Sequence, residues 1–572
     1  MPKKICIVGA VALGPKAACR IRRLDPEAEI TLIDREAVIS YGGCGIPYFL
    51  SGEIADSNAL RETIYHALRD EEFFAETKRV TVRTQTDCLA IDRAAKTIRV
   101  RDLVTGAEED LAYDVLVLGC GSRSFIPPVP GADLPGVTTI GDLPHAEAVK
   151  DRIAKGEVES AVIVGAGAIG LEAAEAMTAL WGVQTTVLEM CDQVLPGALS
   201  PDMAGMVATH MREQGVRVHT GCALKSLEAG EDGHLTEAVT SEGRIPCQLV
   251  IFAAGVRPNG ELAAAAGLDM GPHGGVLVDE SMRTSDPAIF AGGDCVQVKN
   301  LITGDWMFLP LGSMANRQGR VIGTNAVGGD AHFPGAVGSF ILKAFDISAG
   351  TAGLTAEQAR KAGFDAADAL VSGTDWAHFY PGKQPLYLRL IADRATRKVL
   401  GIEAVGFNGD AVKARVDAVA AAMCHGAVVE DISNLEVAYA PPFASAMDVV
   451  NTVANVCENI IEGRADCMTP AEFIEAMDGD TPILDVRSMD FAEPYIAKYG
   501  DRWQCIPQDE LPGRVDEVPR GGPLIVFCNT GTRSFECQVL LRQNGFEGTK
   551  NVQGGAAAAM AMNPEFFEGL KK

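Results

Sequence analysis

Apolar and polar positions at the start of the chain predict a strand, a glycine turn, a helix and a second strand in succession. Residues 4–8 form an apolar, β-prone run, and residues 17–24 continue with a helical pattern. A second apolar run at residues 29–33 ends in Asp34. An acidic residue about 20 positions past the glycines of such a unit is placed to bind a ribose hydroxyl. The pattern therefore predicts a dinucleotide-binding βαβ unit.

The glycine turn of this first unit departs from the dinucleotide fingerprint at one position. Positions one, three and six of G-x-G-x-x-G are occupied by Gly9, Val11 and Gly14. On its own, this copy does not establish a binding site. Together with the strands and the acid that surround it, the turn leads us to expect dinucleotide contacts from Gly9, Ala12 and Gly14.

A second copy of the unit fits the fingerprint completely. A strand at residues 160–164, a helix at 171–180 and a strand at 184–188 surround its turn. Its glycines occupy all three positions: Gly165, Gly167 and Gly170. Such glycines let backbone N–H groups approach a pyrophosphate, and the helix N-terminus supplies partial positive charge. Because the terminal Glu189 suits a ribose 2′-hydroxyl and repels a 2′-phosphate, we expect NADH to be preferred, with NADPH possible.

Two dinucleotide units in one chain predict two dinucleotides, FAD at the first and NADH at the second. Residues 113–121 have the pattern of a strand that leaves the first unit, and residues 248–258 resemble it at the end of the second. A strand within residues 284–295 then ends in Gly-Gly-Asp294. With these motifs the chain resembles the pyridine nucleotide–disulfide oxidoreductases, in which the last motif returns the chain to the FAD domain. The resemblance implies that Asp294 contacts the ribityl chain of the flavin.

The sequence Ser-Tyr-Gly-Gly-Cys-Gly-Ile-Pro at residues 40–47 carries the first candidate redox thiol, Cys44. Pro47 suits the first turn of a helix, and a helix N-terminus stabilises the thiolate of a cysteine that precedes it. Two-cysteine members of the superfamily carry C-x-x-x-x-C, but the residue five positions past Cys44 is Phe49. We therefore expect Cys44 to act alone, through a mixed disulfide, a persulfide or a sulfenic acid. Ser40 is expected to hydrogen-bond near it.

The family resemblance becomes more specific when more of the chain is included. Three segments resemble the single-cysteine branch that contains coenzyme A disulfide reductases and NADH-dependent persulfide reductases: residues 9–24, 40–47 and 439–443. The resemblance covers the chain to about residue 462 and implies a homodimer in which the partner subunit supplies a tyrosine to the active site. Tyr439 occupies the matching position. Tyr380 lies in a second aromatic patch that resembles a substrate contact of the branch.

Composition and charge argue against several other classes of protein. The 572 residues include 50 Lys plus Arg and 76 Asp plus Glu, so the formal charge is −26. We therefore expect no nucleic acid or anionic membrane as the main partner, because both demand a basic face. No apolar run reaches about 18 residues, which argues against a membrane span. The 15 cysteines are scattered and odd in number, so we expect a reducing, cytoplasmic environment.

Against this acidic background, the first predicted helix carries four cations within eight residues. They are Lys16, Arg20, Arg22 and Arg23. In the branch named above this helix lies near the phosphates of coenzyme A, which Arg and Lys bind well. The resemblance implies that Lys16, Arg20 and Arg22 bind coenzyme A. It leaves open whether coenzyme A is a substrate or a tightly held cofactor.

A new α/β unit with a second candidate thiol, Cys528, begins toward the C-terminus. Thr-Pro-x-Glu at residues 469–472 is a helix-start pattern, and an apolar strand at residues 523–528 ends at the thiol. The spacing Cys528-x-x-x-x-Arg533 before a helix predicts a cradle in which backbone N–H groups and Arg533 face the sulfur. With Asp-Val-Arg at residues 485–487, this loop resembles that of a rhodanese, which is a sulfurtransferase.

Together these observations predict an α/β chain with two Rossmann-like dinucleotide-binding domains, an α+β dimerisation domain and a C-terminal α/β rhodanese domain. The expected boundaries are residues 1–118 with 280–332 for FAD, 119–279 for NADH, 333–462 for dimerisation and 468–572 for the rhodanese. The expected function is FAD-dependent reduction of a persulfide, polysulfide or coenzyme A disulfide by NADH, with sulfur delivered by the rhodanese domain. We predict no metal. Two alternatives are an NADH oxidase or peroxidase that uses a Cys44 sulfenic acid, and a cofactor-binding redox or sulfide sensor.

Overall fold

The computed structural model of the chain describes residues 1–567 and divides into two compact units. The first unit holds residues 1–190 and 222–336, and the second holds residues 191–221 and the chain from residue 337 onward. The last residues of the predicted rhodanese domain, 568–572, lie outside the described part. The boundaries of the four expected domains stay a prediction.

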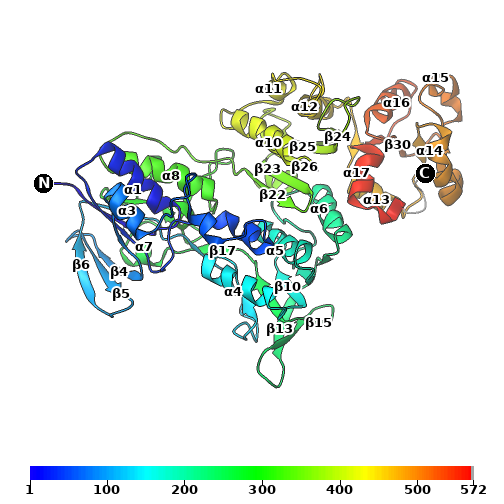
Figure 1. The fold of residues 1–572 in the computed structure, drawn as a ribbon. Helices are drawn as coiled ribbons and strands as arrows, with labels where there is room; N and C mark the ends of the chain where they lie inside the picture. The colour runs from blue at the N-terminus through cyan, green and yellow to red at the C-terminus, as the bar shows by residue number, and fades with distance from the viewer. Residues whose placement is uncertain (568–572) are drawn as a thin grey trace. The chain divides into compact units, whose positions relative to one another are not determined.

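The first unit contains two parallel sheets, and the N-terminal strand belongs to one of them. The strands of this sheet are β1 (Lys4–Val8), β2 (Glu29–Ile33), β3 (Thr81–Arg83), β7 (Val115–Leu118) and β19 (Ile289–Ala291). They lie in the order β19-β7-β1-β2-β3 and pair in parallel. Between β1 and β2, helix α1 (Leu13–Leu24) lies beside α8 (Gly312–Asn325) (Figure 1). Gly319 and Gly323 of α8 let the two helices approach closely.

The other parallel sheet of the first unit contains the second glycine turn. Four strands of this five-stranded sheet belong to the first unit: β9 (Val137–Thr138), β10 (Ser160–Val164), β11 (Gln184–Leu188) and β16 (Leu249–Phe252). Helix α4 (Leu143–Ala154) precedes β10, and α5 (Ala168–Ala179) joins β10 to β11. Both α1 and α5 begin earlier than the pattern predicts, because the last residues of each glycine turn already form the first helical turn.

Smaller elements complete the first unit. Two antiparallel sheets are formed by β4 (Thr86–Asp92), β5 (Thr97–Asp102) and β6 (Glu108–Ala112), and by β13 (Leu224–Ala229), β14 (Leu235–Thr240) and β15 (Arg244–Pro246). The remaining elements are η1 (Gly43–Gly45), α2 (Ile46–Ser51), η2 (Ser57–Arg61), α3 (Glu71–Lys78), β8 (Ser122–Ser124), β17 (Val256–Pro258), α7 (Glu261–Ala265), β18 (Val276–Leu277), η3 (Gly293–Cys295), β20 (Val296–Lys299) and β21 (Trp306–Met307).

An antiparallel sheet with helices forms the first part of the second unit. Its strands follow the order β22 (Phe340–Ala344), β23 (Ile347–Gly353), β26 (Val399–Gly406), β25 (Pro385–Asp393) and β24 (Ala366–Thr374). The accompanying elements are α6 (Pro201–Glu213), β12 (Arg217–His219), α9 (Ala356–Lys361), α10 (Gly409–Met423), α11 (Val429–Ser433) and α12 (Val449–Ile461). This is the α+β architecture that the sequence predicts for the region.

The C-terminal part of the second unit is a parallel sheet with helices. The strands follow the order β27 (Cys467–Met468), β31 (Thr549–Val552), β30 (Leu524–Phe527), β28 (Ile483–Asp485) and β29 (Trp503–Cys505). The helices are α13 (Pro470–Ala476), α14 (Met489–Tyr499), η4 (Gly500–Arg502), α15 (Leu511–Arg514), η5 (Val515–Glu517), α16 (Thr532–Gln543), α17 (Gly555–Met562) and η6 (Glu565–Phe567). Helix α13 begins at the predicted place, where Thr469 and Glu472 form a capping box. The predicted α/β fold class is confirmed.

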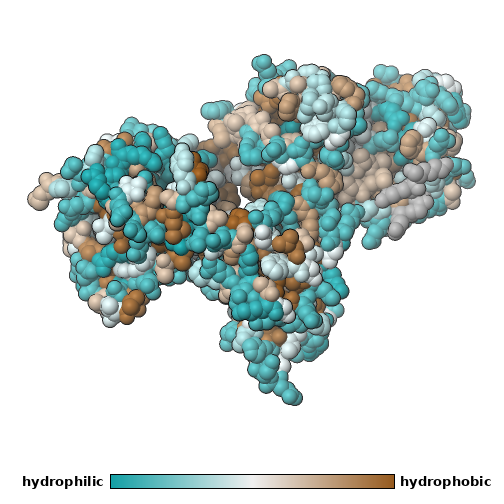
Figure 2. All heavy atoms as spheres, in the orientation of Figure 1, coloured by the Kyte–Doolittle hydropathy of each residue, from teal (hydrophilic) through white to brown (hydrophobic). Residues whose placement is uncertain are grey.

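Hydrophilic side chains cover most of the face drawn in Figure 2, in keeping with the net charge of −26. Within residues 1–567, no helix is long and apolar enough to cross a bilayer.

Candidate active site

The first glycine turn leaves no room for larger residues at its two glycines. Gly9 has a φ of +105°, and a Cβ added there would lie 2.0 Å from the carbonyl oxygen of Gly119. A Cβ on Gly14 would lie 1.9 Å from the carbonyl oxygen of Gly9. Ala12 is the N-cap residue of α1. The turn therefore brings backbone N–H groups to the end of β1, which is the arrangement that a dinucleotide phosphate requires.

The second glycine turn has the same construction and an open space beside it. Gly165 has a φ of +108°, and a Cβ on Gly170 would lie 1.9 Å from the carbonyl oxygen of Gly165. A Cβ on Gly167, the N-cap residue of α5, would meet no atom within 4 Å. A side chain there would fill the space that a pyrophosphate needs beside the helix N-terminus. The turn fits a dinucleotide.

A backbone N–H group of each turn donates a hydrogen bond to the acidic residue that follows the next strand. An oxygen of Asp34 accepts a hydrogen bond from the backbone N–H of Ala10 at 2.6 Å. An oxygen of Glu189 accepts one from the backbone N–H of Ala166 at 2.8 Å. Burial raises the pKa of Asp34 above its ordinary value. The two acids thus lie next to the two turns, as ribose recognition would require.

Asp294 lies in η3, directly after β19, as the Gly-Gly-Asp motif predicts. The hydroxyl of Ser122 donates a hydrogen bond to it at 3.0 Å. Burial raises the pKa of this carboxyl group. Because β19 pairs with β7 in the sheet that holds the first glycine turn, Asp294 belongs to the same end of that sheet.

Cys44 is an exposed cysteine in η1, immediately before α2. Pro47 lies in the first turn of α2, where the sequence predicts a helix start. A Cβ added to Gly312, the first residue of α8, would lie 3.3 Å from the sulfur of Cys44. The thiol is therefore next to the N-terminal end of a second, longer helix, where partial positive charge favours an anion.

Ser40 connects the segment before Cys44 to the first glycine turn. It is buried, has a φ of +53°, and donates a backbone hydrogen bond to the carbonyl oxygen of Ala10 at 2.8 Å. The structure gives this backbone contact for Ser40, whereas a hydroxyl contact with Cys44 stays a prediction. The redox segment and the turn expected to bind FAD are thus parts of one local structure.

The predicted coenzyme A cations on α1 differ in their surroundings. The aliphatic stems of Lys16 and Arg20 lie against Gly319 and Gly323 of α8. The guanidinium of Arg20 also donates to the hydroxyl of Thr324 at 3.0 Å. Both residues are half-buried.

Arg22 has a structural role. Its guanidinium donates hydrogen bonds of 2.6–3.3 Å to backbone carbonyls of five residues: Asp25, Pro26, Ala28, Lys78 and Arg79. These bonds join the end of α1 to the end of α3. Because its donors are used in this way, we do not carry Arg22 forward as a phosphate ligand.

A second group of cations lies around Cys19, which is on the same helix. Burial raises the pKa of Cys19, and four nearby cations oppose that rise: Lys78, Arg23, Lys16 and Arg69. Lys16, Cys19 and Arg23 are spaced to share one face of α1. Arg23 is exposed, unlike Arg22. The sequence placed Arg23 among the four cations but could not show that Lys78, from α3, joins them.

Tyr439 and Tyr380 both belong to the second unit. Tyr439 is 49% exposed and Phe443, close by in the same loop, is 69% exposed. The ring of Tyr380 packs edge-on against Trp376, with 5.7 Å between the ring centroids. An exposed aromatic surface of this kind is typical of an interaction site.

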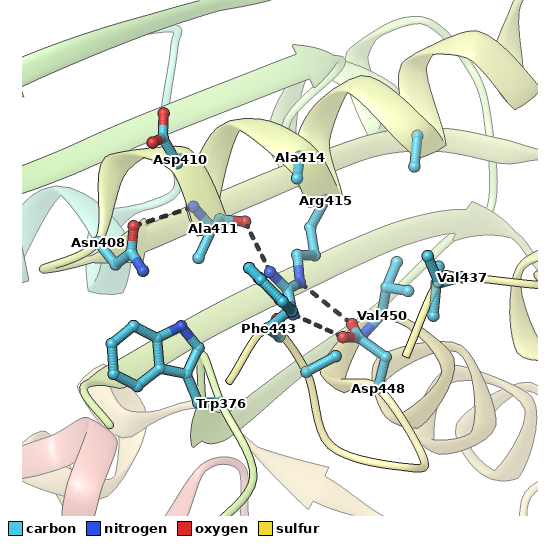
Figure 3. A pocket seen from close by; sticks show the side chains of 13 residues that line it. Trp376, Asn408, Asp410, Ala411, Ala414, Arg415, Val437, Phe443, Asp448 and Val450 are labelled. Carbon is cyan, nitrogen blue, oxygen red and sulfur yellow. Dashed lines mark hydrogen bonds and ion pairs between the residues drawn. The ribbon is translucent and has the colours of Figure 1, made fainter. Parts of the chain in front are cut away.

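A groove of about 370 Å³ lies beside these aromatic residues (Figure 3). Trp376 and Phe443 form part of its wall. At its base Arg415 forms a buried ion pair with Asp448 at 2.6 Å, and it donates to the carbonyl oxygen of Phe443 at 3.1 Å. These bonds hold the exposed loop against α10.

Cys528 lies in a cradle at the end of β30, and its side chain is only 1% exposed. The backbone N–H groups of Gly531 and Ser534 point at its sulfur, at 3.2 and 3.4 Å, and the hydroxyl of Ser534 lies 3.2 Å away. These are the N–H groups that the loop spacing predicts. Arg533 is half-buried in the first turn of α16; its role at the sulfur stays a prediction.

Glu172 is a candidate that the motif search missed. It lies two residues past Gly170 in α5, and burial together with the nearby Glu175 raises its pKa to about 7. Such a shift beside a cofactor turn marks a candidate functional group. The sequence carried a signal for it, because two carboxylates three residues apart lie in a mainly apolar helix that follows a glycine fingerprint.

Comparison with known protein families shows the family to which the chain belongs. The family described as pyridine nucleotide-disulphide oxidoreductase matches residues 3–318, and the dimerisation domain of the same family matches residues 340–450. The chain belongs to this family. Its members use FAD and NAD(P)H, so the prediction of a flavin- and pyridine-nucleotide-dependent oxidoreductase is confirmed.

Three similar proteins carry names that bear on the substrate. An "NAD(P)H sulfur oxidoreductase (CoA-dependent)" from Pyrococcus furiosus is 32% identical over 455 residues, which are 79% of this chain and 99% of that protein. An "NADH oxidase" from Methanocaldococcus jannaschii is 34% identical over 78% of this chain and 97% of its own length. The solved structure of an NAD-dependent persulfide reductase from A. fulgidus is 39% identical, with a TM-score of 0.91 over 98% of this chain and all of that one.

Proposed function

We propose that this enzyme uses NADH to reduce a persulfide, a polysulfide or a coenzyme A disulfide at the single thiol of Cys44. The observation that carries the proposal is the position of Cys44, which is exposed beside the first residue of α8 in the unit that contains both dinucleotide turns. The names of the P. furiosus and A. fulgidus proteins support a sulfur substrate. FAD, when bound, supplies two-electron transfer between NADH and sulfur.

The chain's own residues account for the sulfur chemistry. With a coenzyme A persulfide, the Cys44 thiolate attacks the outer sulfur, and the bond between the two sulfurs of the substrate breaks. Coenzyme A leaves as its thiolate, and Cys44 becomes a persulfide. Two electrons that originate from NADH, together with one proton, then convert this persulfide to the Cys44 thiolate and hydrogen sulfide. The nearby N-terminus of α8 stabilises the Cys44 thiolate that attacks the substrate and that is regenerated by the reduction.

We further propose that coenzyme A binds at the cations of α1. Lys16 and Arg23, together with Lys78 from α3 and with Arg69, form a basic cluster in a strongly acidic chain, and Arg20 lies on the same helix as the first two. Such a cluster attracts the negatively charged phosphate groups of coenzyme A, and Arg binds phosphate in a bidentate manner. Arg23→Ala should weaken coenzyme A persulfide as a substrate and leave inorganic polysulfide unchanged. Tyr380 is the further contact suggested by the family resemblance.

The homodimer is also a proposal. The match to the dimerisation domain supports it, and the exposed aromatic loop with Tyr439 and Phe443 beside a groove supplies a surface to bury. In this arrangement Tyr439 reaches the active site of the partner subunit, as the resemblance implies. Analytical ultracentrifugation of the holoenzyme measures the state directly.

We propose that residues 468–572 are a rhodanese domain that loads sulfur on Cys528 and passes it toward coenzyme A or Cys44. The N–H cradle around a sulfur at the end of a parallel strand supports this role. Arg533 would add positive charge to the cradle. The similarity to the A. fulgidus persulfide reductase extends over this region as well.

The cysteines support a reducing environment. All 15 are free thiols in the described chain, and three of them are exposed. We therefore infer that the protein works in a reducing compartment such as the cytoplasm.

Anaerobic NADH consumption tests the proposal. Polysulfide, coenzyme A persulfide and coenzyme A disulfide are compared with oxygen, and sulfide is measured directly. Cys44→Ser should abolish turnover with every sulfur acceptor, whereas Cys528→Ser should lose only the reactions that begin with a separate sulfur donor. Rapid turnover with oxygen alone would favour the activity named in the M. jannaschii relative. Full sulfide production by Cys44→Ser would exclude the proposed mechanism.

A further inference from the structure

The short helix that follows Cys44 is held at its C-terminal end by two side chains from other helices. The last carbonyl groups of a helix lack partners within it. In α2, the carbonyl oxygen of Phe49 accepts a hydrogen bond from the ammonium of Lys150 at 2.7 Å. The carbonyl oxygen of Leu50 accepts one from the indole N–H of Trp181, also at 2.7 Å. Two successive carbonyls are thus bound by side chains from outside α2, and the carbonyl of Phe49 also accepts a hydrogen bond from the backbone N–H of Gly52 at 3.2 Å.

Lys150 is bound more tightly than a surface lysine. Its ammonium also lies 3.3 Å from the carbonyl oxygens of Ile54 and Ala55, and 3.8 Å from the centre of the Phe49 ring. Burial lowers the pKa of this lysine below its ordinary value. A cation at this end of α2 also complements the partial negative charge of the helix. The contacts join α4 to the chain segment that follows Cys44.

Trp181 comes from the helix of the second glycine turn. It follows α5 by two residues, and the other end of α5 carries Gly167 beside the open space of the turn. Leu180 packs against the C-cap of α2, since a Cβ added to Gly52 would lie 2.6 Å from its side chain. A helix of this length spans about 18 Å. One rigid helix therefore has the dinucleotide turn at one end and the Cys44 helix at the other.

We propose that Lys150 and Trp181 are positioning residues that couple the dinucleotide turn of α5 to Cys44 through α2. The inference rests on the proposed role of Cys44 and adds to it a route by which the occupied pyridine-nucleotide site is sensed at the thiol. α2 is only six residues long, so its position depends on these contacts more than on its own hydrogen bonds. Neither residue touches the reacting sulfur.

The test measures the reactivity of Cys44 rather than turnover alone. Oxidised holoenzyme is treated with iodoacetamide, with and without saturating NAD⁺, and alkylation of the Cys44 peptide is followed by mass spectrometry. We expect NAD⁺ to change the wild-type rate by about fivefold. Lys150→Met keeps an unbranched side chain over Phe49 and removes the ammonium donor, and Trp181→Phe keeps one aromatic ring and removes the indole N–H. In both variants we expect the effect of NAD⁺ to disappear.

Three further measurements separate coupling from other causes. Lys150→Arg restores donors to the carbonyls and should restore the NAD⁺ effect. Lys155→Met, an exposed lysine at the end of the same helix that pairs with Asp151, should behave as wild type. In the two test variants kcat should fall about tenfold, with the KM for NADH changed less than about twofold.

Two outcomes would overturn the proposal. If NAD⁺ merely shields the thiol, its effect will persist in both variants; and if the wild type shows no effect, no coupling exists. Should Lys150→Met lose its flavin, Trp181→Phe decides the matter, because it removes the other donor to α2 and keeps an aromatic ring in its place. Turnover by Cys44→Ser would refute the proposed function, but the alkylation result would stand independently, since it requires only the thiol.

Discussion

Cys44 and Cys528 both lie in a turn that precedes a helix, yet one is exposed and the other is enclosed. Cys44 lies between two glycines in η1, with the N-terminal end of α8 beside its sulfur. Cys528 is covered on all sides in the second unit, and its partners are the N–H groups and the hydroxyl of its own loop.

The difference separates two kinds of sulfur chemistry. An exposed thiol exchanges with substrates of many sizes, because its attack requires only a free approach to the sulfur–sulfur bond. An enclosed sulfur with several N–H donors holds an anion well but exchanges it only when the loop opens. We therefore expect Cys44 to be the site of exchange with free substrate, and Cys528 to be a site of sulfur storage and transfer.

The largest expected effect comes from glycine substitutions in the two loops. A Cβ on Gly555 would lie 2.5 Å from the carbonyl oxygen of Cys528, and its φ is +57°. We expect Gly555→Ala to destabilise the C-terminal part by about 2–5 kcal/mol. A Cβ on Gly43 would meet nothing closer than 3.9 Å, so Gly43→Ala should change stability by less than about 1 kcal/mol. Thermal unfolding of both variants provides the comparison, and equal losses would show that the loops are equally tight.

Alkylation should separate the two thiols by about a hundredfold. At pH 8 iodoacetamide should modify Cys44 rapidly and Cys528 slowly, because only the first is exposed. The neighbours of Cys528 should stay unmodified: burial raises the pKa of Cys537 and Cys467 to about 12 and of Cys505 to about 11. Peptide mapping over time measures all of them together. Rapid labelling of Cys528 would mean that its loop is open in solution.

The parts of the fold that the sequence predicted best are the strands beside the glycine turns. The runs at residues 4–8, 29–33, 160–164 and 184–188 form strands with those same bounds. Each is a short β-prone run next to a glycine or a charged residue, so local pattern alone defines it. Helices α1 and α5 begin before the predicted starts, because the last glycine of each turn already lies in the first helical turn.

Burial and long-range partners could not be predicted in this way. The carbonyls that engage Arg22 include those of Lys78 and Arg79, more than 50 positions away, and no spacing rule connects them. The enclosure of Cys528 likewise depends on residues 554–556, which follow a separate strand. Local sequence thus predicted both thiols as candidate redox sites, whereas exposure was set by segments that only the fold brings together.

The two regions also differ in the charges that surround their buried carboxylates. Near Cys528, Asp485 is neutralised by Arg487 in a buried pair at 2.7 Å. In the first unit, α5 packs against α2, and burial of Glu172 on α5, together with the neighbouring Glu175, raises its pKa to about 7. The folded state therefore loses stability as pH rises from the unfolded value of 4.5 through 7.

Glu172→Gln should remove that cost. We expect the variant to be more stable than wild type by about 1–3 kcal/mol at pH 8 and equal to it near pH 4.5. Release of flavin fluorescence during heating measures the first unit alone. Glu147→Gln, at an exposed position on α4, serves as the control and should show no pH-dependent gain. A loss of stability in Glu172→Gln at low pH would mean instead that the neutral carboxyl group stabilises the folded state, through a hydrogen bond of its own.

The smallest expected effect is that of Ser534→Ala, which removes one donor from the cradle of Cys528. The hydroxyl lies 3.2 Å from the sulfur and 2.5 Å from the amide oxygen of Asn551, so it can donate to either. When sulfur carries negative charge, we expect the hydroxyl to turn toward it, while the two backbone N–H groups remain. Loss of one donor among three should slow alkylation of Cys528 at neutral pH by about threefold, which corresponds to less than about 1 kcal/mol. Ser534→Thr keeps the hydroxyl and should restore the rate, and Cys44 should react at the same rate in all three proteins. If Ser534→Ala instead accelerates Cys528, then the hydroxyl acts mainly to close the loop through Asn551, and enclosure rather than anion binding limits the second thiol.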